Sequence, residues 1–195
     1  MRIFLCRHGQ TTGDIEDRYG GSYDDHLTDE GIKQSEDLAE KLKKSGIQKI
    51  YTSSLVRAKE TSSIIGKKLE AEIEETPELK ERNIYGVLSG MVKSEAREKF
   101  PDLVEAVKDF KNTIDMAESY EAAQERMLTG FKKVLRSKEK IVAVVTHGGT
   151  IKSIFRKLIG KEVSRIVDCG YAELEWNGRN LDLLRSDGIE MAPVQ

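Results

Sequence analysis

The chain has 195 residues, of which 38% are hydrophobic and 34% are charged. This length favours a single domain with at most a small insertion, and the hydrophobic content permits a real core. The charges nearly cancel to a net charge of −2, which gives no support to binding of nucleic acid or another polyanion. No apolar run approaches the roughly 20 residues needed to cross a bilayer. With no recognisable signal peptide and only two unclustered cysteines, Cys6 and Cys169, we expect a cytoplasmic protein without a disulfide framework, zinc site or membrane partner.

The N-terminal half alternates predicted strands and helices. In chain order these are a buried strand at 2–6, a glycine-rich loop at 9–27, a helix from the N-cap Thr28 to Gly46, a strand at 47–52, a helix from Ser54 to Leu69 and a strand at 72–75. The first helix is expected to face the core with Ile32, Ser35, Leu38, Ala39 and Leu42. Residues 78–117 lack strong periodicity, and we interpret them as a small helical insertion with short helices at 92–99 and 101–110.

The C-terminal half continues the alternation. A long helix at 118–136, a buried strand at 141–145, a helix at 149–159 and two strands at 172–176 and 181–184 are predicted, with Asn177-Gly178 as the hairpin turn. The tail from Ser186 is expected to be loose, and 172–176 is expected to be an edge strand able to pair across a homodimer. The whole pattern predicts a three-layer α/β/α fold with a mostly parallel central sheet flanked by helices.

Two of the three histidines close buried strands beside glycine. His8 lies in Arg7-His8-Gly9, and His147 lies in Thr146-His147-Gly148-Gly149. Ligands of open α/β sheets bind outside the carboxyl ends of the strands, where Arg57 is also expected, just after the second strand. A neutral imidazole can attack phosphorus, arginine can grip phosphate oxygens, and a second histidine can donate to them. Each residue alone has an ordinary structural interpretation, but their conjunction indicates phosphoryl transfer.

Four segments carry a resemblance to a known family. They are Leu5-Cys6-Arg7-His8-Gly9-Gln10-Thr11, Leu27-Thr28-Asp29-Glu30-Gly31-Ile32-Lys33-Gln34, Tyr51-Thr52-Ser53-Ser54-Leu55-Val56-Arg57-Ala58-Lys59-Glu60-Thr61 and Val145-Thr146-His147-Gly148-Gly149. Over nearly its whole length the chain resembles the histidine phosphatase superfamily, the phosphoglycerate mutase-like proteins. The resemblance implies that His8 is phosphorylated and that Arg7, Arg57 and His147 bind the phosphate. Gly148 is a further candidate for phosphate binding, because its backbone amide is open at the start of the next helix. The resemblance also implies a catalytic carboxylate, for which Glu81 is the best match and Glu78 a rival.

The loop after the first strand departs from the family in part. Where many relatives carry Trp-Asn, this chain has Gly13-Asp14, and an ionised Asp14 accepts hydrogen bonds and repels a phosphate dianion. The residues that we expect to contribute to substrate binding from this loop are Gln10, Thr11, Asp14, Arg18, Gly20 and Gly21.

The main hypothesis is an enzyme that transfers a phosphoryl group from a small phosphomonoester to His8 and then to water, without a metal. One alternative is a phosphoglycerate mutase that depends on 2,3-bisphosphoglycerate, because residues 81–86 resemble the mutase version of that segment. Two features oppose this alternative. The chain is shorter than typical cofactor-dependent mutases, and the insertion lacks the dense arginine cluster expected for binding a second phosphate. A third hypothesis is an inactive module that binds phosphorylated ligands.

Overall fold

The central feature of the computed structural model, which describes residues 1–193, is a six-stranded sheet in the order β3-β2-β4-β1-β5-β6. The strands are β1 (Arg2–Arg7), β2 (Lys49–Thr52), β3 (Glu72–Glu75), β4 (Ile141–Thr146), β5 (Val163–Trp176) and β6 (Leu181–Met191). The first four are parallel to one another, whereas β5 runs antiparallel to β1 and β6 antiparallel to β5.

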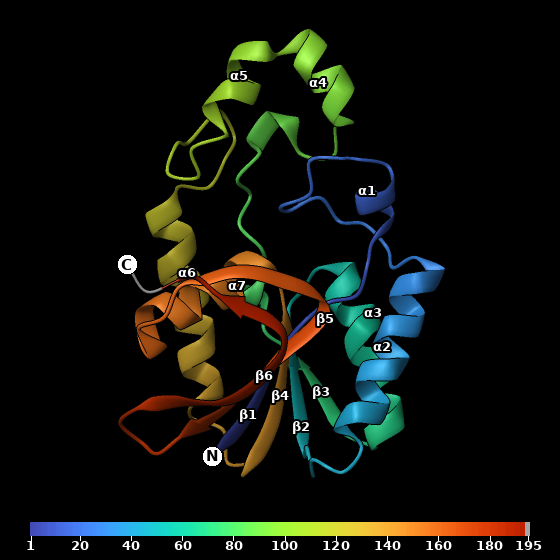
Figure 1. Ribbon diagram of the computed structural model, residues 1–195, viewed down its shortest axis with the longest axis vertical. Coiled ribbons are helices and arrows are strands. Elements are labelled where there is room, and N and C mark those ends of the chain that lie inside the picture. Colours follow the sequence, from blue (N-terminus) through green and yellow to red (C-terminus); the bar gives the residue numbers. More distant parts are fainter. Residues whose placement is uncertain (194–195) are drawn as a thin grey trace.

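Helices cover both faces of this sheet (Figure 1). Those on the faces are α2 (Asp29–Leu42), α3 (Val56–Leu69), α6 (Tyr120–Val134) and α7 (Gly148–Ile154), whereas α1 (Thr12–Ile15), α4 (Lys93–Lys99) and α5 (Pro101–Ala106) lie beyond the edge of the sheet. Short turns of other helix types are η1 (Pro77–Leu79), η2 (Gly86–Leu88) and the π-helical η3 (Phe155–Ile159), which continues α7. None of the helices in the described part of the chain is long and apolar enough to span a membrane.

Side chains that alternate in direction along the buried strands form two hydrophobic cores, one on each face of the sheet. Phe4 and Cys6 of β1 pack with α2 and α3 on one face, whereas Ile3 and Leu5 pack with α6 and α7 on the other. Successive side chains of a strand point to opposite faces, so a strand buried on both sides reads as a continuous apolar run. The predicted three-layer α/β/α fold with its mostly parallel sheet is confirmed.

Four details of the sequence-based expectation are wrong. Ile32 is 42% exposed, because α2 turns it away from the face that buries Ser35. Ser54 is not the N-cap of α3. The N-cap is Leu55, which has no capping side chain, and the Asp24 carboxylate accepts from the Val56 amide in its place. The segment 172–176 lies between β1 and β6 rather than at an edge, and residues 186–191, expected in a loose tail, belong to β6.

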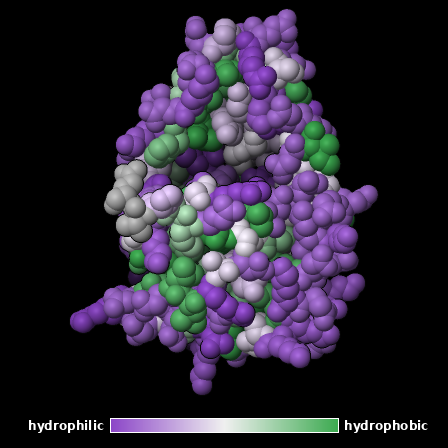
Figure 2. All heavy atoms as spheres, in the orientation of Figure 1, coloured by the Kyte–Doolittle hydropathy of each residue, from purple (hydrophilic) through white to green (hydrophobic). Residues whose placement is uncertain are grey.

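The parallel strands bring their carboxyl ends to one edge of the sheet. Arg7 is paired with Thr146, and Thr52 with Val145, so the residues that follow β1, β2 and β4 lie together. Above this edge stands a cap, residues 86–117, which contains η2, α4 and α5 and has a small apolar cluster of its own around Leu88 and Ala96. Figure 2 shows the surface recessed between the cap at the top and the body below it.

Candidate active site

His8 follows β1 and is held in one orientation and one tautomer. Its Nδ1 lies 2.7 Å from the carbonyl oxygen of Gly9, and since a carbonyl only accepts, Nδ1 carries the proton. Nε2 therefore keeps a lone pair, toward which Arg57 Nε donates at 3.2 Å. Burial, followed by the positive charges of Arg57 and Arg7, places the pKa of His8 well below its ordinary value. The imidazole is thus neutral at neutral pH, with Nε2 as its nucleophilic atom.

Arg57 is fixed by four hydrogen bonds in the first turn of α3. Besides His8, it donates to the carbonyls of Gly21 and Tyr23, both at 2.7 Å, and to Asp25 Oδ1 at 2.9 Å. The side chains of Arg57 and Asp25 are 5% and 4% exposed. Asp25 was not anticipated from the sequence, because an acidic residue in a polar loop gives no signal that separates a buried partner from a solvated charge. Its carboxylate keeps the guanidinium in place beside His8.

Two buried nitrogen atoms at this site have no hydrogen-bond partner within the described chain. Arg7 donates to the Ile166 carbonyl at 2.6 Å and pairs with Asp168 at 3.0 Å, but its Nε is unpartnered. His147 contacts Ser53 Oγ through Nε2 at 2.7 Å, and its Nδ1 is unpartnered. Buried polar groups are nearly always satisfied, so these atoms indicate a ligand with acceptor oxygens.

His147 lies against His8, with ring centroids 5.1 Å apart. Burial, Arg57, His8 and Arg7 lower the pKa of His147 well below its ordinary value, so this imidazole is also neutral. When Nε2 accepts from the Ser53 hydroxyl, the single ring proton sits on the unpartnered Nδ1. That tautomer makes Nδ1 a buried donor without a partner among the described residues.

Glu81 supplies the carboxylate of the site, and Glu78 does not. Glu81 Oε1 accepts from the Arg82 amide at 2.9 Å and Oε2 from the Gly149 amide at 2.8 Å. A Cβ on Gly149 would lie 2.3 Å from Oε1, so only glycine permits this approach. Glu78 instead pairs with Lys133 of α6, and it does not line the cavity.

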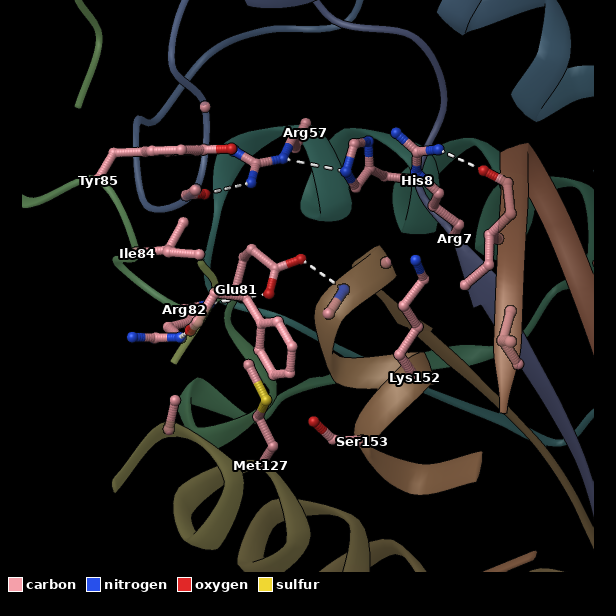
Figure 3. A pocket seen from close by; sticks show the side chains of 18 of the residues that line it. Arg7, His8, Arg57, Glu81, Arg82, Ile84, Tyr85, Met127, Lys152 and Ser153 are labelled. Carbon is pink, nitrogen blue, oxygen red and sulfur yellow. Dashed lines mark hydrogen bonds between the residues drawn. The ribbon is translucent and has the colours of Figure 1, made fainter. Parts of the chain in front are cut away.

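Arg7, His8, Arg57 and Glu81 line one cavity of about 760 Å³. His147 is not among the lining residues and meets the site through its ring contact with His8. Figure 3 shows Arg57, His8 and Arg7 along one wall and Glu81 facing them from another. Of the other predicted residues, Gly148 and five from the loop line the same cavity, namely Thr11, Asp14, Arg18, Gly20 and Gly21. Gln10 is not among the lining residues, because it turns to α2, where its side chain accepts from Thr28 and its amide donates to Gln34.

Asp14 has a structural partner that explains its presence. Its Oδ2 accepts from the amide and the hydroxyl of Thr11 at 3.0 and 2.9 Å, which forms the capping box of α1. The carboxylate is therefore engaged at the start of this short helix while it lines the cavity.

Arg82 ties the cap to the segment that carries Glu81. Its guanidinium is buried and donates to the carbonyls of Phe110, Asn112 and Glu118. Because Phe110 also lines the cavity, one arginine positions the upper wall relative to the neighbouring carboxylate. No sequence pattern indicates this role of Arg82, since its partners are backbone carbonyls of an irregular segment.

A family model described as histidine phosphatase superfamily (branch 1) matches residues 3–186. The chain belongs to this superfamily. It is 33% identical over 162 residues to the metal-independent phosphoserine phosphatase of Arabidopsis thaliana, covering 80% of this chain and 68% of that protein. It is 32% identical over 168 residues to the 2,3-bisphosphoglycerate-dependent phosphoglycerate mutase of Parvibaculum lavamentivorans, covering 80% and 79%. The structure of Bacillus stearothermophilus YhfR shares its fold, with a TM-score of 0.84 at 24% identity over 94% and 95% of the two chains. Relatives in the family include phosphatases and mutases, and the chain is accordingly a phosphoryl-transfer enzyme.

Proposed function

We propose that this enzyme hydrolyses a small phosphomonoester through a phosphohistidine intermediate on His8. The observation that carries the proposal is the lone pair on His8 Nε2 beside two unpartnered buried nitrogens, Arg7 Nε and His147 Nδ1. These atoms match a phosphoryl group whose phosphorus faces Nε2 and whose oxygens accept from both neighbours. Arg57 adds a fixed positive charge at the same place.

The first step is attack of His8 Nε2 on phosphorus. The P–N bond forms as the ester P–O bond breaks, and the leaving oxygen takes a proton from the carboxyl group of Glu81. Arg7, Arg57 and His147 stabilise the charge on the phosphoryl oxygens during the transfer. The alcohol leaves, and the imidazole carries the phosphoryl group.

Water completes the cycle. The Glu81 carboxylate takes a proton from a water molecule, whose oxygen attacks phosphorus as the P–N bond breaks. The electron pair returns to Nε2, and inorganic phosphate leaves. The charge stabilisation comes from side chains, and we infer that no metal is required, as the name of the phosphoserine phosphatase relative supports.

Phosphoglycerate mutase activity is the alternative, favoured by relatives of that name. It would use the same phosphohistidine but return the phosphoryl group to a hydroxyl of a sugar acid, with 2,3-bisphosphoglycerate as the cofactor that maintains the phosphorylated enzyme. An inactive module would share the pocket and lack both steps.

The test is phosphate release from a panel of phosphomonoesters in EDTA, including 3-phosphoglycerate with and without 2,3-bisphosphoglycerate. Metal-independent release from one compound supports hydrolysis. Interconversion of phosphoglycerates without matching release would overturn hydrolysis in favour of the mutase. No turnover of any compound, together with tight phosphate binding, would favour the inactive module.

We also propose that the chain acts as a single domain in which the insertion, residues 78–117, and the loop after β1 set substrate specificity. Both contribute to the cavity wall opposite the sheet, as Tyr85 and Arg18 illustrate. A cytoplasmic location fits the two free cysteines, Cys6 and Cys169.

A further inference from the structure

We infer that the cavity contains a second anion subsite at Lys152, which binds a carboxylate on the leaving group of the substrate. The inference rests on the proposed function, because it concerns the part of the phosphomonoester that departs from phosphorus. It narrows the substrate to a phosphorylated hydroxy acid or a compound with the same two charged groups.

The backbone places Lys152 one helical turn after the residue that holds the Glu81 carboxylate. Lys152 follows Gly149 by three residues in α7, and side chains three apart lie on the same helix face. Gly149 is the residue whose amide holds Glu81. Lys152 therefore lies one helical turn from the residue that holds the proposed acid, and Figure 3 shows its amino group extending into the cavity toward the side where Arg7 and His8 lie.

The Lys152 ammonium has unused hydrogen-bonding capacity. Its one hydrogen bond within residues 1–193 is to the Ser164 carbonyl at 3.2 Å, and no carboxylate of those residues lies within ion-pair distance. An ammonium has three donors, so two stay available. Arg156, one turn further along, differs because Glu162 already holds its guanidinium.

Lys152 is the basic side chain of the cavity wall that the described residues engage least. Seven basic side chains and three carboxylates line the cavity, although the whole chain has a net charge of −2. Five of the seven basic groups already pair with a carboxylate, and Arg82 donates to three backbone carbonyls; the five are Arg7, Arg18, Arg57, Arg156 and Arg165. A phosphate held by Arg7 and Arg57 leaves Lys152 without an ion-pair partner among the described residues, which favours a second anionic group there.

The experiment compares 3-phosphoglycerate with glycerol 3-phosphate, which differ in having a carboxylate or a hydroxymethyl group. Binding is measured by calorimetry on the His8→Asn variant, which cannot form the intermediate, while phosphate release is followed in the otherwise unchanged enzyme. We expect His8→Asn to bind 3-phosphoglycerate about 10- to 100-fold more tightly, as one charge-assisted hydrogen bond predicts. Adding Lys152→Met removes this preference, Lys152→Arg keeps it, and Lys157→Met, which changes an exposed lysine outside the cavity wall, leaves it unchanged.

Three results would overturn the subsite. These are equal affinity for both compounds, a preference that survives Lys152→Met, or a loss in Lys152→Met that is as large for inorganic phosphate as for 3-phosphoglycerate. The last would place Lys152 on the transferred phosphoryl group. Phosphate release without a carboxylate preference leaves the hydrolytic function standing and removes the subsite. Carboxylate-selective binding without release of phosphate from any compound removes hydrolysis and leaves the subsite.

Discussion

Replacing Gly149 with alanine should displace the Glu81 carboxylate without destabilising the fold. The added Cβ would lie 2.3 Å from Glu81 Oε1, whereas ordinary contact begins at 3.4 Å. The carboxylate must therefore move by about 1 Å, and it can do so cheaply because it is the end of a flexible side chain. A misplacement of this size costs about 100-fold in rate. The thermal midpoint of Gly149→Ala should stay close to that of the unchanged protein.

The assay uses two substrates and a neighbouring variant. An alkyl phosphate needs protonation of its leaving oxygen, so we expect kcat/KM for it to fall about 100-fold in Gly149→Ala. With p-nitrophenyl phosphate, whose leaving group needs little protonation, the loss should stay below about 10-fold. Gly148→Ala places its Cβ in open space and should lose much less on the alkyl phosphate. Equal losses on both substrates, or an equal loss in Gly148→Ala, would refute the role assigned to Glu81.

Three further outcomes follow from the same geometry. Asp25→Asn leaves the buried Arg57 charge unpaired, so unfolding should become easier by about 3–5 kcal/mol, roughly 6–20 °C in thermal midpoint. Millimolar phosphate should restore part of the lost stability. A thermal midpoint of Asp25→Asn that phosphate does not raise would argue against Arg57 as a phosphate ligand. The pKa values of His8 and His147 are lowered by folding, so below about pH 6.5 the unfolded chain binds protons that the folded chain does not. Stability should then fall by up to about 1.4 kcal/mol per pH unit for each histidine. In denaturant titrations, the free energy of unfolding of His147→Asn should fall less steeply between pH 6.5 and 5.5 than that of the unchanged protein. An unchanged dependence on pH would contradict the lowered pKa of His147. Activity should survive dialysis against EDTA, whereas loss that Mg²⁺ or Zn²⁺ restores would contradict a metal-independent reaction.

The sequence predicted the elements whose hydrophobic pattern is regular and whose ends carry clear signals. β1 and β4 are continuous apolar runs, and Thr28 caps α2 as expected. The long β5–β6 hairpin was only half predicted, because β-bulges and the positive φ of Cys169 and Gly188 break the alternation on which strand prediction depends.

For the site, the sequence predicted the residues that end parallel strands but not those that hold them. Arg7, His8 and His147 follow from β1 and β4, and the structure brings them together with Arg57. Asp25 and Arg82 could not be predicted in the same way, because their partners are brought near only by the folded loop and cap. Gln10, expected in the substrate loop, faces α2 instead, since register within an irregular loop has no periodic pattern.

The most direct measurement is mass spectrometry of the enzyme quenched during turnover of a phosphomonoester. We expect one acid-labile phosphoryl group on the peptide that contains His8, formed and lost as fast as the substrate turns over. It should be absent from His8→Ala, which should release no phosphate. A phosphoryl group on another residue, or continued turnover by His8→Ala, would contradict the phosphohistidine mechanism.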